Sequence, residues 1–137
     1  MAKAYHLRLG AIQPTQLYIN ARKLAMLEEK YPPGTEENMD PVPVISIHGK
    51  LVYTDGHTRA FLIWKRGFEW IDVVWDDDEL DEMTYETCLR WCKAEGISTI
   101  ADLNNRIIDD EAYQEKWIAR CQAIDSDNSK RFKIENP

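Results

Sequence analysis

The most constraining feature of this 137-residue sequence is the stretch VYTDGHTRAFLIW, residues 52–64. Within a few positions it changes from strand-like residues to a helical spacing of apolar side chains. Asp55 and Gly56 stand at the junction and favour a turn, and Gly67 is placed to end the helix as a C-terminal cap. The stretch therefore predicts a strand that passes through a tight polar turn into the N-terminus of a helix.

The residues on either side of this stretch predict a mixed α/β unit. LRLGAI (7–12) alternates as a strand does, and Pro14 then fixes a turn. Residues 16–30 have the spacing of a helix, and the segment 31–43, with four prolines, predicts an ordered loop. VISI and LVYT on either side of HGK predict a two-strand hairpin, and WIDVVW (70–75) predicts a buried strand.

The second half of the chain has helical periodicity. It predicts one helix that ends near Gly96, a second that starts in STIADLNNRI, and a third over DDEAYQEKWIARCQAI. Thr99 and Asp102 are spaced like the capping pair of the second helix. The acidic run DDDELDE (76–82) is typical of a solvated linker or of a helix start.

These patterns together predict one α+β fold with an appendage. We expect a mixed-sheet domain over residues 1–78, a helical extension packed on it over residues 79–125, and a flexible tail over residues 126–137. A chain of 137 residues has room for one domain with a real core, and two full domains would be cramped.

Charge and cysteine content restrict the partners and the compartment. The formal net charge of −7 argues against nucleic acid and anionic lipid, which require clustered Lys and Arg. No apolar run has the length of a signal-peptide core or a membrane span, so we expect a cytoplasmic protein without membrane contact. Cys88, Cys92 and Cys121 are an odd number without a secretory context, which predicts reduced thiols.

The residues after the turn have the chemistry of an anion site. The N-terminus of a helix offers backbone N–H groups and the positive end of its dipole. Gly56 allows close approach of a ligand, Thr58 can donate from its hydroxyl, and Arg59 offers a planar fork that matches phosphate or carboxylate. His57 can donate or accept, and Asp55 could orient its neighbours, hold a metal-bound water or act as a base.

A purely structural interpretation of the same residues stays open. Asp55 and Gly56 would then form a turn, Thr58 would cap the helix, and Arg59 would pair with Glu69 or another acid. The motif lies between a predicted strand and a helix that leads to another predicted strand, and this context favours the interpretation as an anion site.

The order of these elements resembles the ParB/sulfiredoxin-like superfamily over about residues 7–75. The resemblance rests on IQPTQL, a following helix, and PVPVISIHGKLVYTDGHTRAFLIWKRGFEWIDVVW. It implies a ParB/sulfiredoxin-like mixed sheet in which the strand-turn-helix motif is the phosphate-binding part of a nucleotide site. ATP, ADP or CTP with Mg²⁺ would then be the cofactor, held by Gly56, His57, Thr58 and Arg59.

Comparison with individual members of that superfamily narrows the chemistry. Sulfiredoxin-like members have a cysteine where this chain has His57, and ParB-type CTP switches have an arginine-rich motif. The motif looks closest to free serine kinases and related ADP-binding proteins, which carry DGHHR where this chain has DGHTR. Their activating glutamate corresponds here to Gln16, or to Thr15, and neither can serve as a base.

Three functions follow as hypotheses. The first is binding of a phosphate-bearing small molecule, and the second is phosphate transfer of the free serine kinase type, with Asp55 and His57 as candidate catalytic residues. The third is a non-catalytic interaction module. The tail resembles extensions of small bacterial ParB-like domains in Firmicutes, some of which occur alongside acetyltransferases, so an acetyltransferase-associated partner or a homodimer is also implied.

Other candidate sites have plainer interpretations. AEGISTIADLNNRI resembles a helix-turn-helix, but it lacks the basic residues of a recognition helix. The three cysteines lack a fourth ligand at zinc spacing, so we expect core packing and no metal site. Trp91 and Trp117 fit core packing first and a dimer contact second, and His48 fits a turn.

Overall fold

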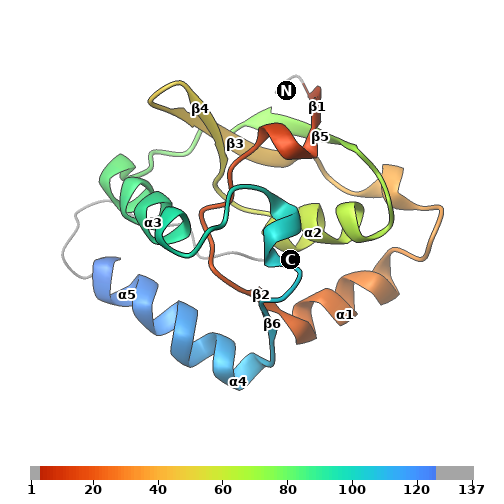
Figure 1. Cartoon of the computed structure of the whole chain (residues 1–137). Coiled ribbons are helices and arrows are strands. Elements are labelled where there is room, and N and C mark those ends of the chain that lie inside the picture. The colour runs from red at the N-terminus through yellow and green to blue at the C-terminus, as the bar shows by residue number, and fades with distance from the viewer. Residues whose placement is uncertain (1–3, 126–137) are drawn as a thin grey trace.

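A four-stranded mixed sheet lies across the top of the computed structural model, which describes residues 4–125 (Figure 1). Its strand order is β1-β5-β3-β4. The strands are β1 (Tyr5–Arg8), β3 (Val42–Ile47), β4 (Lys50–Tyr53) and β5 (Trp70–Trp75). β5 is antiparallel to β1 and parallel to β3, and β3 and β4 are antiparallel neighbours. The predicted α+β class is confirmed, and the predicted tail, residues 126–137, lies outside the described residues.

One N-terminal segment reaches both edges of this sheet. β1 pairs with β5 at one edge, and Gln13 then bridges Val52 of β4 at the other. The Gln13 N–H donates to the Leu51 carbonyl at 2.9 Å, and the Tyr53 N–H donates to the Gln13 carbonyl at 3.1 Å. The buried Gln13 side chain also donates to the Ile97 carbonyl at 2.8 Å, which ties this segment to the C-terminal half.

The hairpin and the helix after it are confirmed. His48 and Gly49 join β3 to β4 with φ of 50° and 77°, as a two-residue hairpin turn of the primed type requires. The helix α2 (His57–Lys65) then lies below the sheet in Figure 1, and Gly67, with φ of 91°, follows its end. Phe61 of this helix is fully buried in the core. The predicted helix over 16–30 is α1 (Ala21–Lys30), and the loop that follows contains a short 3₁₀ helix, η2 (Glu36–Asn38).

Two strand predictions need correction. The strand predicted over 7–12 ends at Arg8, and Leu9–Ala11 form a 3₁₀ helix, η1, because the Leu9 side chain turns into the core. β5 was predicted to be buried, but only its alternate residues are. Ile71 and Val73 are buried, whereas Trp70 and Trp75, at the two ends of the strand, are 41% and 47% exposed.

The C-terminal half contains two of the three predicted helices at full length. α3 (Glu82–Ala94) begins at the cap residue Asp81, so the acidic run is a helix start. The second predicted helix is only a 3₁₀ turn, η3 (Ile100–Leu103), although Thr99 and Asp102 form the predicted capping box. The third is a continuous helix made of α4 (Asp110–Tyr113), a π-helical turn over Gln114–Ile118, and α5 (Ala119–Asp125).

The C-terminal half is joined to the first half by a short parallel pair of strands. β6 (Ile107–Ile108) pairs with β2 (Ile19–Asn20), and this short chain segment leaves no room for η3 to continue as a helix. Trp91 and Trp117 pack edge to face with ring centroids 6.0 Å apart, which confirms their packing role. The three cysteines are buried and free, as predicted.

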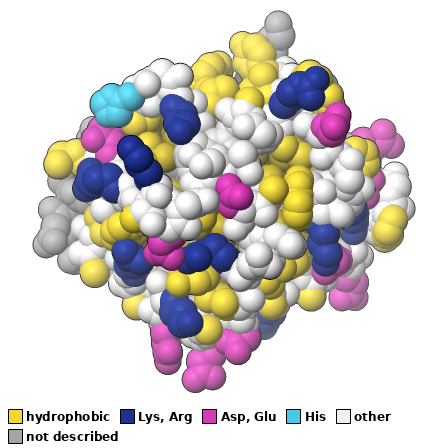
Figure 2. Space-filling view, in the orientation of Figure 1, with side chains coloured by type: hydrophobic (Ala, Val, Ile, Leu, Met, Phe, Trp, Pro, Cys, Tyr) yellow, Lys and Arg dark blue, Asp and Glu magenta, His cyan; other side chains and the backbone are white. Residues whose placement is uncertain are grey.

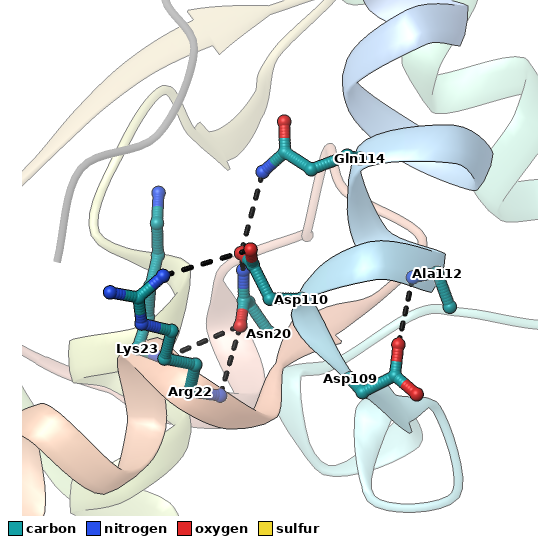
Figure 3. A network of polar contacts seen from close by, with 7 residues as sticks. All are labelled: Asn20, Arg22, Lys23, Asp109, Asp110, Ala112 and Gln114. Carbon is teal, nitrogen blue, oxygen red and sulfur yellow. Dashed lines mark hydrogen bonds and ion pairs between the residues drawn. The ribbon is translucent and has the colours of Figure 1, made fainter.

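The β2–β6 junction places two helix N-termini side by side (Figure 3). Asn20 caps α1, since its Oδ1 accepts from the backbone N–H groups of Arg22 and Lys23. Its Nδ2 donates to Asp110 Oδ1 at 2.9 Å in the first turn of α4. Asp110 also pairs with the Arg22 side chain at 3.8 Å. One buried asparagine therefore satisfies groups on both helices.

Replacement of Asn20 by alanine is expected to lower the free energy of unfolding by about 1–2 kcal/mol, because it removes the cap of α1. It also removes the donor to Asp110. Urea unfolding of the variant measures the loss. Arg22→Ala is the control, since that side chain is 70% exposed and its ion pair is worth about 0–1 kcal/mol. Equal stability of Asn20→Ala and the wild type would contradict this role of the junction.

Candidate functional site

The turn between β4 and α2 is anchored at its first residue, Thr54. The Thr54 N–H donates to the Pro43 carbonyl at 3.2 Å, and its hydroxyl donates to Asp76 Oδ2 at 2.5 Å. The Tyr85 hydroxyl donates to the Thr54 carbonyl at 3.4 Å. The neighbouring strand β3, the end of β5 and α3 therefore all hold the point at which the chain leaves the sheet.

Gly56 is required by both the backbone and its surroundings. It is the N-cap of α2 in the left-handed region, with φ of 74° and ψ of 21°. A Cβ atom there would lie 2.8 Å from Arg59 Nη2 and 2.9 Å from Val42 Cγ1. Its N–H donates to Asp55 Oδ1 at 2.8 Å. The glycine thus lets the Arg59 guanidinium and the Val42 side chain lie directly against the turn.

His57 is a buried neutral imidazole. It is 2% exposed, and its Nε2 accepts the Thr15 backbone N–H at 2.9 Å. Because Nε2 is the acceptor, the ring proton of the neutral form lies on Nδ1. Burial lowers the pKa of His57 to about 3. The ring joins the early Pro14 turn to the first turn of α2, and it packs on Tyr53 with ring centroids 5.3 Å apart.

The five motif residues divide into an inner and an outer set. Gly56, His57 and Thr58 are buried, whereas Asp55 and Arg59 are half-buried. Thr58 lies in the first turn, and the N-cap is Gly56. The side chains that reach the surface at this turn are therefore a carboxylate and a guanidinium.

Arg59 is held by carbonyl groups. Its Nη1 donates to the Asp40 carbonyl at 3.0 Å and to the Pro41 carbonyl at 3.4 Å, in the loop before β3. Within residues 4–125 no carboxylate lies within ion-pair distance of the guanidinium, and the buried Nε has no hydrogen-bond partner. The structural interpretation in which Arg59 pairs with Glu69 or another described acid is therefore wrong.

A second arginine of α2 holds the same loop. Arg66 Nη1 pairs with Glu36 Oε2 at 2.6 Å, and both side chains are largely buried. This ion pair and the bonds from Arg59 hold the proline-rich loop against α2, in agreement with the ordered loop that the sequence predicted. The loop forms one wall beside Gly56.

Thr15 and Gln16, which the resemblance aligns with a kinase glutamate, lie in a segment that contacts the motif, and neither side chain can act as a base. The Thr15 hydroxyl donates to the Tyr53 carbonyl at 2.6 Å, and Gln16 Nε2 donates to the Tyr18 carbonyl at 2.8 Å. Both side chains are buried. The Tyr53 hydroxyl, also buried, has no hydrogen-bond partner within the described residues, and burial raises its pKa.

Contacts from distant segments were not predicted. Asp40 and Asp76 reach the motif from loops that carry no sequence signal for it, whereas Thr15 belongs to the segment IQPTQL, on which the resemblance partly rests. Pro41, which restricts the chain before β3, was the one local hint at an ordered carbonyl wall.

The other predicted sites have structural roles. Burial raises the pKa of Cys88 and raises those of Cys92 and Cys121 to about 12, so these thiols are protonated at neutral pH. His48 is a turn residue near Glu86. The segment that resembles a helix-turn-helix contains only η3, which is too short for a recognition helix.

Metal and membrane signals are absent from the described part of the chain. Residues 4–125 contain no group of three or more His, Cys, Asp or Glu that could hold a metal ion. Over the same residues, every helix is too short or too polar to cross a bilayer. On the face shown in Figure 2, Lys and Arg alternate with Asp and Glu and form no continuous basic surface.

Comparison with known proteins shows the fold alone. No family model matches the sequence, and no curated protein matches it. Among solved structures, the chain is similar to protein Atu1540 from Agrobacterium tumefaciens, with a TM-score of 0.55 and 12% sequence identity. The match covers 97% of this chain and 74% of that one. The same arrangement of elements therefore occurs in a solved protein of very different sequence.

Proposed function

We propose that the chain is a ParB/sulfiredoxin-like domain that binds a phosphate-bearing small molecule at the turn between β4 and α2. A nucleotide is the ligand class to test first. The observation that carries the proposal is Arg59, a half-buried cation without a carboxylate partner among the described residues. Such a group is stabilised by an anion, and phosphate matches its fork of donors.

The surrounding residues would support the same ligand. Gly56 keeps the turn free of a side chain beside the guanidinium, and His57 fixes the turn through Thr15. The α2 dipole adds positive potential at this end. Arg59 would exchange its bonds with the Asp40 and Pro41 carbonyls for bonds with phosphate oxygens, because charged acceptors bind a guanidinium more strongly than carbonyls do.

Asp55 makes the proposed binding dependent on a cation. Its carboxylate accepts the Gly56 N–H, which places a negative charge at the turn. This charge would repel a bare phosphate, which is also negative. Mg²⁺ is commonly bound by one or two carboxylates together with substrate phosphates. Asp55 is suited to that arrangement, and we expect nucleotide affinity to rise when Mg²⁺ is added.

Titration calorimetry with ATP, ADP, CTP and inorganic phosphate, with and without Mg²⁺, tests the proposal. Arg59→Ala is expected to weaken binding about tenfold or more, since it removes charge-assisted hydrogen bonds. Lys65→Ala is the matched control, because it removes one positive charge from the far end of the same helix. The proposal fails if none of these ligands binds to the wild type, or if Arg59→Ala binds as the wild type does.

A further inference from the structure

A groove lies between α3 and the C-terminal helix. Its volume is about 360 Å³. α3 lines it with Met83, Thr87 and Trp91, and α5 lines it with Ala123 and Ile124. In Figure 1 the start of α3 and the end of α5 both lie on the left of the molecule. The groove is therefore next to the point where the chain leaves α5.

The groove has an apolar rim and an aromatic wall. Met83 is 72% exposed, which is the largest exposed fraction among the large hydrophobic side chains of residues 4–125. Trp91 is half-buried, and the Arg120 guanidinium lies over its ring, with Cζ 3.8 Å from the ring centroid. Apolar side chains that covered this surface would stabilise it, because they would remove apolar area from water.

The surface at the start of α3 is strongly acidic. Residues 76–82 contain six acids in seven positions, and Met83 follows them directly. Asp77 and Glu79 are among the acids that are exposed. Electrostatic complementarity favours a cationic partner at such a surface. A segment that fits this end of the groove should therefore carry both apolar and positively charged side chains.

The chain itself supplies a segment with this chemistry. Residues 126–137 follow the last turn of α5 and contain the sequence KRFKI at positions 130–134. Three cations stand there beside two large apolar residues, Phe132 and Ile134. The segment therefore matches the groove in hydrophobicity and is opposite in charge to the acidic run.

The segment is also long enough to reach the groove. Phe132 is seven residues beyond Asp125, so it can lie up to about 25 Å from the end of α5. α3 has 13 residues and is about 20 Å long. Because the segment is attached beside the groove, its effective concentration there is in the millimolar range, and weak contacts are sufficient for binding.

We propose that residues 126–137 dock on the groove between α3 and α5 of the same molecule. Phe132 and Ile134 would cover the apolar surface around Met83, and the neighbouring cations would face the acidic run. The composition of the segment predicted a flexible tail, whereas the groove and its charge give the segment a surface to bind. The proposal does not rest on the phosphate site, so Arg59→Ala is expected to leave the docking unchanged.

Methionine methyl NMR of the full chain is the first test. Phe132→Ala is expected to shift the Met83 methyl resonance, because a nearby aromatic ring changes the chemical shift of a methyl group. Met26, 56% exposed on α1, is the surface control, and Met39 in the core reports that the fold is intact. Neither control resonance should move. An unchanged Met83 resonance in the folded variant overturns the proposal.

A second copy of the chain is the other possible source of the segment. A Met83 shift difference that is independent of protein concentration supports docking within one molecule. A difference that disappears on dilution, together with elution as a dimer from a sizing column, would place the segment on a second copy and overturn the proposal.

Trypsin cleavage after Arg131 measures how far the segment is protected. The full chain is expected to be cut there about tenfold or more slowly than a synthetic peptide of residues 126–137, because docking leaves only the open fraction to the protease. Mass spectrometry follows the two rates. Cleavage of the full chain as fast as the peptide overturns the proposal.

The same assay tests the contribution of charge. Asp77→Asn/Glu79→Gln should speed cleavage after Arg131 about two- to fivefold, since exposed ion pairs are worth up to about 1 kcal/mol. Glu111→Gln/Glu115→Gln removes the same charge from exposed positions of the C-terminal helix and should leave the rate unchanged. Equal rates in the two double variants contradict the pairing of the segment with the acidic run.

Discussion

Acidification below pH 6.5 is expected to destabilise the protein through His57. Burial lowers the pKa of this imidazole from 6.5 to about 3 in the folded state. Between these values the unfolded chain binds a proton that the folded chain does not. The contribution of His57 to the free energy of unfolding is therefore fully present above pH 6.5. As the pH falls from 6.5 toward 3, the free energy of unfolding decreases by up to about 1.4 kcal/mol per pH unit.

Urea unfolding between pH 7 and pH 5 measures this dependence. Carboxylates whose pKa values are lowered in the folded state, such as Asp102, start from an ordinary pKa of 3.8, so they change stability mainly below this pH range. His57→Gln keeps an acceptor for the Thr15 N–H but does not titrate, and it should flatten the slope. His48→Gln, at an exposed turn, should retain it. A slope in His57→Gln that equals the wild-type slope would show that His57 is not the source.

Replacement of Gly56 by alanine is expected to reduce both stability and phosphate binding. The substitution places an L-residue at φ of 74°, which costs about 1–2 kcal/mol. It also places a Cβ 2.8 Å from Arg59 Nη2 and 2.9 Å from Val42 Cγ1, so these side chains must shift. Overpacking of this kind costs about 1–3 kcal/mol more.

Gly96→Ala is the matched control for that prediction. Gly96 has φ of 75°, almost the value of Gly56, but nothing lies within 4 Å of its Cβ position. It therefore reports the backbone cost alone. Chemical unfolding should show Gly56→Ala to be less stable than Gly96→Ala, and calorimetry should show lost nucleotide binding only in the former. Equal stability of the two variants would mean that the packing of Arg59 against the turn is unimportant.

Local patterns predicted the fold where short-range chemistry decides it. The hairpin at Gly49, the turn at Gly56 and the helix end at Gly67 follow from glycine's access to positive φ. The capping pair Thr99 and Asp102 was also predicted correctly, yet its helix stops after four residues. The chain must turn there to pair β6 with β2, and pairing with a strand some 90 residues earlier has no local signal.

The sequence by itself determined the strand-turn-helix, its glycine and the residue types that can meet an anion. Tertiary structure alone decided what those residues do. The backbone N–H of Thr15, 42 positions before His57, donates to His57 Nε2. The carbonyl groups of Asp40 and Pro41 accept hydrogen bonds from Arg59 Nη1. Turns and helix starts depend on a few neighbouring dihedral angles, so they can be predicted locally. Burial, pKa and the absence of a described counter-charge at Arg59 depend on which distant segments pack together, which only the folded chain specifies.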